Sequence, residues 1–194
     1  MSPPFEALRD ALVRETVALL RDHPPTEISI RDLARRLGVS SGAPFHHFED
    51  RAALFAAVAL DGWRAVHRRL DGVPEGDPDA RLPRMTREYL AFALEHPEHY
   101  RVRFLAELKD AERFAELHAI SFGTFGRFLA EVARIRGCAP DDPALVVRVL
   151  SSWSTIHGFA LLTADGTLEG KMGSYGQAAL VDGVVAGALR AALG

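Results

Sequence analysis

Apolar residues recur at helical spacing along almost the whole chain of 194 residues. No segment shows the strict alternation of apolar and polar residues that is typical of a strand. Prolines, glycines and short polar runs divide the pattern into about nine helices, predicted over residues 4–22, 30–37, 41–47, 51–71, 81–95, 98–108, 111–136, 143–164 and 174–193. The pattern therefore predicts an all-α fold.

A polar segment with two prolines and two glycines, residues 72–79, follows the fourth predicted helix. Such a composition is typical of a linker. We therefore expect a small N-terminal domain of three helices over residues 1–50. A connecting helix over residues 51–71 would join it to a larger helical domain over residues 72–194.

The second and third predicted helices have the pattern of a helix-turn-helix. Ser29 is the expected N-cap of the first of them, and Gly38 ends it, since glycine tolerates a positive φ. If Ser41 caps the next helix, Pro44 lies in the first turn, where its missing N–H costs no hydrogen bond. If Ser40 is the cap, one helical hydrogen bond is lost. A unit of this shape can place its second helix in the major groove of DNA.

The second helix of this unit offers few side chains that can hydrogen-bond a base. Base reading would depend on His46, with contacts from Ala43 or Pro44 to thymine methyl groups.

Arg51 begins the next predicted helix, directly after the expected cap Asp50. The helix dipole disfavours a cation there by about 0.3–1 kcal/mol. A DNA phosphate at the same helix end would reverse that effect. The alternative for Arg51 is an ion pair with Glu49 or Asp50 in solvent.

The run from Gly38 to Leu54, GVSSGAPFHHFEDRAAL, resembles the DNA-binding signature of the TetR family of bacterial transcriptional regulators over its whole length. The resemblance implies that His47 and Arg51 contact backbone phosphates. It also places Phe45 where the family has a phosphate-binding tyrosine, whose hydroxyl is missing here. The residues expected to bind DNA are Ser29, Ser40, Ser41, Gly42, Ala43, Pro44, Phe45, His46, His47 and Arg51. A helical corner without a nucleic-acid partner is the alternative.

The same resemblance implies a C-terminal domain that binds a small-molecule effector. The segment SWSTIHG, residues 152–158, resembles the WHG-type C-terminal domain of some TetR regulators. It puts Trp153 and His157 on one helix face, where they line a pocket or pack in the core. The residues expected to line an apolar effector pocket are Tyr89, Phe92, Phe104, Phe122, Phe125, Trp153 and His157. Helical spacing does not separate residues that line a pocket from residues that fill a core.

Dimerisation through the last two helices is also implied by the family. In the final predicted helix Ala179, Gly183 and Gly187 recur every four residues on one face. Interior glycines cost a helix about 1 kcal/mol each relative to alanine, and the close approach of another helix offsets that cost. We expect this face to form a homodimer interface; close packing within one chain is the alternative.

Composition limits the partners of the chain. The net charge is −3, with 10 basic and 10 acidic residues up to residue 73 and 13 and 16 beyond it, so DNA contacts must come from a local patch. No apolar run approaches the roughly 20 residues that span a bilayer, and no secretory leader is visible. We expect a cytoplasmic, nucleoid-associated protein with no membrane partner.

Catalytic and metal-binding patterns are missing from the sequence. It contains no nucleophile elbow and no histidine or cysteine spacing typical of zinc, and its one cysteine excludes an intramolecular disulfide. We therefore expect no catalytic residues, no metal and no cofactor. The sequence predicts a ligand-responsive transcriptional regulator, most simply a homodimeric repressor that a small-molecule effector releases from double-stranded operator DNA. An activator of the same architecture, or a small-molecule binder without specific DNA binding, are the alternatives.

Overall fold

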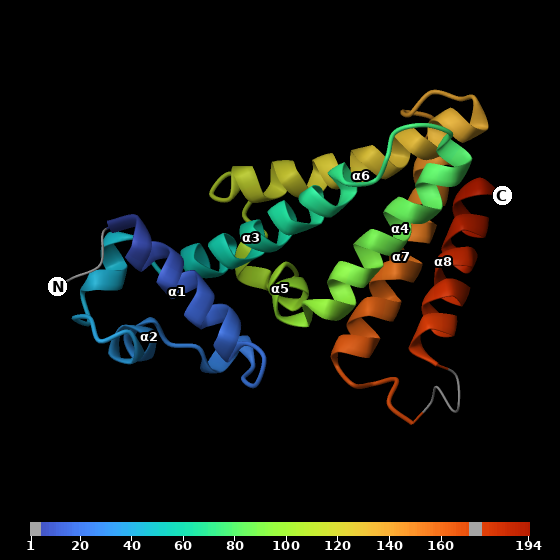
Figure 1. Ribbon diagram of the computed structural model, residues 1–194. Helices are drawn as coiled ribbons and strands as arrows, with labels where there is room; N and C mark the ends of the chain where they lie inside the picture. Colours follow the sequence, from blue (N-terminus) through green and yellow to red (C-terminus); the bar gives the residue numbers. More distant parts are fainter. Residues whose placement is uncertain (1–4, 171–175) are drawn as a thin grey trace. The chain divides into compact units, whose positions relative to one another are not determined.

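The computed structural model describes residues 5–170 and 176–194, and within these ranges it contains helices and no strand. The all-α fold is therefore confirmed. Figure 1 shows the eight α-helices of the described residues: α1 (Phe5–Leu19), α2 (Ile30–Arg36), α3 (Arg51–Asp71), α4 (Pro78–Glu95), α5 (Pro97–Val102), α6 (Ala115–Arg136), α7 (Pro143–Ala164) and α8 (Gln177–Leu193). Three short 3-10 turns accompany them: η1 (Pro25–Glu27), η2 (Ala43–His46) and η3 (Ala106–Leu108).

Most predicted helix bounds agree with the structure, and α3 and α7 have the bounds expected from the sequence. The helix predicted over 98–108 is divided into α5 and η3. α6 begins at Ala115 and not at 111, because the Asp110 carboxylate accepts hydrogen bonds from the N–H groups of Glu112 and Arg113 and holds a turn there. The predicted positions 4, 174 and 175 lie outside the described residues.

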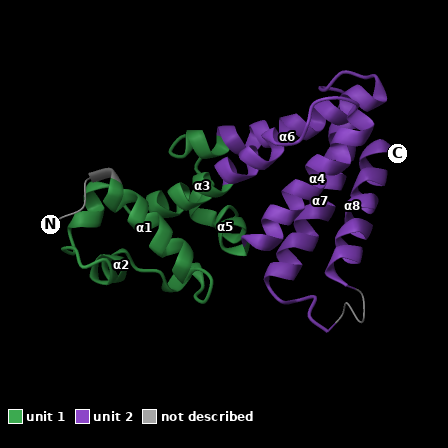
Figure 2. Ribbon diagram, viewed as in Figure 1, with its two compact units in different colours: residues 1–62, 97–118 green, residues 63–96, 119–194 purple. Residues whose placement is uncertain are grey.

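The chain divides into two compact units, coloured separately in Figure 2. Unit 1 comprises residues 1–62 and 97–118, and unit 2 comprises residues 63–96 and 119–194. α3 thus contributes to both units, and the segment 97–118 packs with the N-terminal helices. The domain division predicted from the sequence, which assigned residues 97–118 to the larger domain, stays a prediction.

In unit 1, α1 contacts both α2 and η2, and α2 contacts η2. The core consists of leucine and phenylalanine side chains at helical spacing, with Leu12, Leu33, Leu54 and Phe55 fully buried. Ala34 is also buried, and its small side chain occupies the position where the sequence predicts a close crossing of helices. The described part of α1 therefore packs against both parts of the helix-turn-helix and supports them.

In unit 2, α4, α7 and α8 lie side by side (Figure 1). Their shared core includes Leu82, Met85 and Leu90 of α4 and Leu145 of α7. The second half of α3 is joined to α6 by polar contacts, of which one is a hydrogen bond of 2.8 Å between His67 and Thr124. Burial in this contact lowers the pKa of His67.

Candidate nucleic-acid interface and effector cavity

The turn after α2 is closed by a glycine in the left-handed conformation. Gly38 has φ +67, and its N–H donates to the carbonyl of Arg35 at 3.2 Å. The N–H of Val39 donates to the carbonyl of Ala34 at 3.0 Å. These two bonds form a Schellman motif, which satisfies the last carbonyls of α2. The turn predicted at Gly38 is confirmed.

The second helix of the unit is a single 3-10 turn, η2, and the α-helix predicted over 41–47 is wrong in type. An α-helix capped by Ser40 would need an N–H on Pro44 to bond the carbonyl of Ser40. Proline has none, so the Ser40 carbonyl accepts from Ala43 at 3.0 Å instead. Phe45 likewise donates to Gly42 at 3.1 Å, three residues earlier. Gly42 is the N-cap, so neither Ser40 nor Ser41 takes that role.

Most of the predicted DNA-binding residues of this turn reach the surface. Ser40, Ser41, Gly42, Phe45 and His46 are exposed, and Ser29, Ala43, His47 and Arg51 are half-buried. Pro44 is buried, so only Ala43 of the predicted pair remains available for a thymine methyl group. Phe45 is 47% exposed, which is unusual for a residue with so large an apolar side chain.

Asp50 caps the N-terminus of α3, as the sequence predicts. Its carboxylate accepts a hydrogen bond of 2.9 Å from the N–H of Ala53. Burial acts to raise the pKa of Asp50, but the Ala53 N–H and the Arg113 guanidinium stabilise the carboxylate and lower the pKa overall. Asp50 is thus held in its charged form at the first turn of α3, where the helix dipole favours an anion.

Arg51 forms an ion pair, though with neither Glu49 nor Asp50, the partners named in the alternative interpretation. Its Nη2 lies 3.3 Å from the carboxylate of Glu107 on η3, which is 56 residues away in sequence. Its Nη1 donates to the carbonyl of Pro25 at 3.4 Å, and the guanidinium lies 5.5 Å from the centre of the Phe55 ring. The side chain is nevertheless 39% exposed, so it remains accessible from solvent.

The two acidic residues before Arg51 are paired with Arg113 instead. Its Nη2 lies 2.7 Å from Asp50 and 3.3 Å from Glu49. Sequence reasoning missed both Glu107 and Arg113, because no local pattern connects positions more than 50 residues apart. The segment 97–118 therefore contributes charged groups directly beside the helix-turn-helix.

Unit 2 contains a small apolar cavity. Its free volume is about 20 Å³, room for about a single water molecule. No charged side chain lines it, and the lining residues are Leu82, Thr86, Tyr89, Phe128, Val132, Val149, Ser152, Trp153, Ile156, Leu189 and Ala192. The Tyr89 hydroxyl lies 3.4 Å from Nε2 of His157, and the ring of Trp153 lies 5.0 Å from both rings.

The structure gathers four of the seven predicted pocket residues around this cavity. Tyr89 and Trp153 line it, and Phe125 and His157 contact the Trp153 ring at 5.4 and 5.0 Å. Phe92 is buried and its ring packs 4.9 Å from that of His96. Phe104 belongs to unit 1, and Phe122 is 71% exposed on α6.

The predicted dimer face of α8 is not filled by the described part of the chain. Ala179 and Gly183 are exposed and Gly187 is half-buried, and a Cβ added to Gly183 would meet no atom within 4 Å. The neighbouring helix α7 exposes large apolar side chains at Val147, Leu150 and Leu162. α7 is long and apolar enough to cross a membrane, but a single such helix is weak evidence of that role.

Comparison with known proteins identifies the family. Residues 12–58 match the family described as bacterial regulatory proteins, tetR family, and residues 82–188 match the tetracyclin repressor-like C-terminal domain. The chain belongs to the TetR family of transcriptional regulators. The first match spans α2 and η2, so the helix-turn-helix of unit 1 is the DNA-binding element of a TetR regulator.

Solved structures agree with this assignment. A protein of unknown function from Rhodococcus sp. RHA1 is 30% identical, with a TM-score of 0.69 over 95% of this chain and 93% of that one. A TetR-family regulator from Bordetella parapertussis 12822 shares the fold at 18% identity, with a TM-score of 0.67 over 94% of both chains. One from Streptomyces coelicolor does so at 22% identity, with a TM-score of 0.69 over 98% of this chain and 82% of that one. The comparison with curated proteins found no match.

Proposed function

We propose that this TetR-family regulator is a homodimeric repressor that a small-molecule effector releases from operator DNA. The observation that carries the proposal is the reading turn, residues 40–46, in which Ser40, Ser41, Gly42, Phe45 and His46 are exposed. Gly38 closes the end of α2 before this turn, and Arg51 begins α3 after it. Two such turns in a dimer would read half-sites about one helical turn, roughly 34–36 Å, apart. The protein would act in the cytoplasm, on the nucleoid.

Within this proposal the contacts divide into two kinds. Arg51 and His47 bind phosphates, which positions the protein on DNA of any sequence. His46 is exposed at the end of η2 and is the side chain best able to hydrogen-bond a base. Because η2 offers so few other donors or acceptors, operator choice also depends on half-site spacing and DNA shape.

The partner in the dimer is a second copy of the chain. The exposed apolar side chains of α7 and the open glycine face of α8 support a four-helix interface between two copies. Burial of this surface in a dimer also explains why α7 is so apolar in a DNA-binding protein. Val147→Glu, with Ala130→Glu on the exposed face of α6 as the control, should produce monomers in light scattering only for the first variant.

The effector site is the cavity of unit 2. Its wall of aromatic and aliphatic side chains without charges favours an uncharged, largely apolar effector. Since the free volume holds about one water, the effector must bind a more open state and shift the population towards it. A thermal-shift screen of neutral and charged metabolites, repeated with Trp153→Ala, would identify ligands that depend on this wall.

DNA binding is the decisive test of the proposed function. Fluorescence anisotropy with the DNA upstream of the protein's own coding region should give specific binding at about 10⁻⁸–10⁻¹¹ M. Arg51→Ala should weaken binding to all sequences alike, whereas His46→Ala should change the preference among sequences. Arg68→Ala removes the same charge from an exposed position on α3 and serves as the control. Affinity that stays at the non-specific level of about 10⁻⁴–10⁻⁶ M on every duplex would refute the proposal.

A further inference from the structure

Three ion pairs hold the corner between η2 and α3, residues Glu49, Asp50 and Arg51, to the segment 106–113. Glu107 of this segment binds Arg51 of the corner at 3.3 Å. Arg113, six residues later, binds Asp50 at 2.7 Å and Glu49 at 3.3 Å. The three corner residues are consecutive, and only His47 and Phe48 separate them from the reading turn of residues 40–46. All three charges of the corner are therefore engaged by one short segment of unit 1.

The pair between Glu107 and Arg51 occupies the group that the proposed function assigns to a DNA phosphate. A carboxylate offers the guanidinium two acceptor oxygens, as a phosphate does. Both side chains are partly exposed, 39% for Arg51 and 30% for Glu107, so DNA can approach the pair. We infer that Glu107 is an internal competitor of the operator phosphate, and that it lowers DNA affinity by holding Arg51. The inference rests on the proposed phosphate contact of Arg51.

Arg113 has the opposite effect on the same corner. Asp50 and Glu49 are anions beside the place where a phosphate would bind, and they repel it unless they are neutralised. Arg113 neutralises them and is itself a cation near that place. Loss of Glu107 therefore raises DNA affinity, whereas loss of Arg113 lowers it. A purely structural role for these ion pairs would change affinity in the same direction in both variants.

The chain connects this competitor to unit 2. α5 starts at Pro97, directly after the last residue of unit 2's first segment, and α6 passes from unit 1 into unit 2 after His118. Glu107 lies between these two crossings, on a 3-10 turn of three residues. Glu107 is therefore joined to unit 2 along the backbone on both sides.

The test compares full-length wild type, Glu107→Gln and Glu112→Gln in anisotropy with a labelled duplex of arbitrary sequence, from about 50 to about 200 mM NaCl. Glu107→Gln should bind about two- to fivefold tighter per subunit. For this variant the slope of log K against the logarithm of the NaCl concentration should become more negative by about 0.9 for each additional phosphate that the protein neutralises. Glu112→Gln removes the same charge from an exposed neighbouring position and should change neither quantity to that extent. Arg113→Gln should weaken binding.

Three results would overturn the inference: equal tightening by Glu107→Gln and Glu112→Gln, an unchanged salt slope in Glu107→Gln, or a tightening that persists in the Arg51→Ala background. If Glu107→Gln unfolds at a lower temperature than wild type, the measurement is repeated with Glu107→Ala. The arbitrary duplex is used because phosphate contacts do not depend on sequence. Failure of specific operator binding would thus refute the proposed function, whereas the comparison of variants on the arbitrary duplex could still be interpreted.

Discussion

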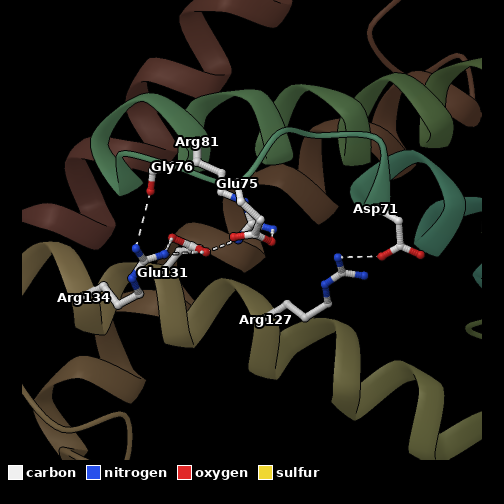
Figure 3. Close-up of polar contacts among 7 residues, drawn as sticks. All are labelled: Asp71, Glu75, Gly76, Arg81, Arg127, Glu131 and Arg134. Atoms are coloured by element: carbon white, nitrogen blue, oxygen red, sulfur yellow. Dashed lines mark hydrogen bonds and ion pairs between the residues drawn. The ribbon is translucent and has the colours of Figure 1, made fainter.

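A buried ion pair inside unit 2 allows a quantitative test of the packing of this unit (Figure 3). Arg81 of α4 binds Glu131 of α6, and both side chains are almost completely buried. Arg81 also lies 2.6 Å from Glu75, and Arg134 binds Glu131 at 3.1 Å and the Gly76 carbonyl at 3.4 Å. The network therefore ties α4, α6 and the loop between α3 and α4 together.

Glu131→Gln removes the charge and replaces one of the two acceptor oxygens by an NH₂ group, while the shape of the side chain is kept. Removing one partner of a buried pair costs about 3–5 kcal/mol, since the other charge stays buried. Here Glu75 still contacts Arg81, but Glu75 is 79% exposed and replaces the lost carboxylate only in part. We expect the free energy of unfolding to fall by about 2–4 kcal/mol. At this chain length the Tm should fall by about 5–15 °C.

Equilibrium unfolding in urea, at fixed protein concentration because the protein is proposed to dimerise, measures this loss. Asp71→Asn is the control: it breaks the pair of 2.8 Å between Arg127 of α6 and Asp71, the exposed last residue of α3 (Figure 3). That loss should stay below about 1 kcal/mol. The double variant Arg81→Met with Glu131→Leu should cost less than Glu131→Gln, since no buried charge remains. If Glu131→Gln and Asp71→Asn lower the free energy of unfolding by the same amount, the argument from burial is wrong.

Two further predictions concern unit 1. Gly38→Ala should lower the free energy of unfolding by about 1–2 kcal/mol, because Gly38 has φ +67, whereas Gly42→Ala at φ −86 should be neutral or slightly stabilising in the same urea titration. Burial acts to lower the pKa of His99, but hydrogen bonds to the Asp61 and Glu98 carboxylates raise it overall. The stability from these contacts is complete below the unfolded pKa of about 6.5 and lost as pH rises through the folded value. Between pH of about 6 and about 8 the urea midpoint of wild type should therefore fall more than that of His99→Gln; an equal fall in both would contradict the assignment.

The helices were predictable because each carries a stripe of apolar residues that must be buried. The spacing of Trp63, Val66 and Leu70 marks α3, and all three are buried. The turn at Gly38 and the cap at Asp50 were predictable because each depends on one residue type at one position. The reading turn was not, because Pro44 lies where two choices of N-cap give different hydrogen bonds.

The site was predictable only where its residues are close in sequence. Trp153 and His157 are one helical turn apart, so their contact followed from the spacing. Phe104 and Phe122 also lie in segments whose apolar residues recur at helical spacing, yet both are exposed. Helical spacing alone does not tell which face of a helix is buried. The partner of Arg51 depends on where the segment 97–118 folds back, which local patterns do not encode.

The strength of the Arg51–Glu107 ion pair limits what it can do in regulation. An exposed pair is worth about 0.2–1 kcal/mol, so the two pairs of a homodimer amount to about 0.4–2 kcal/mol. Coupling between an effector and DNA is typically about 1–3 kcal/mol. In the proposed homodimer, competition by Glu107 would therefore tune operator affinity and supply part of the proposed response, and the rest would come from a change in the separation of the two reading turns. It follows that Glu107→Gln should bind DNA more tightly and yet remain responsive to the effector.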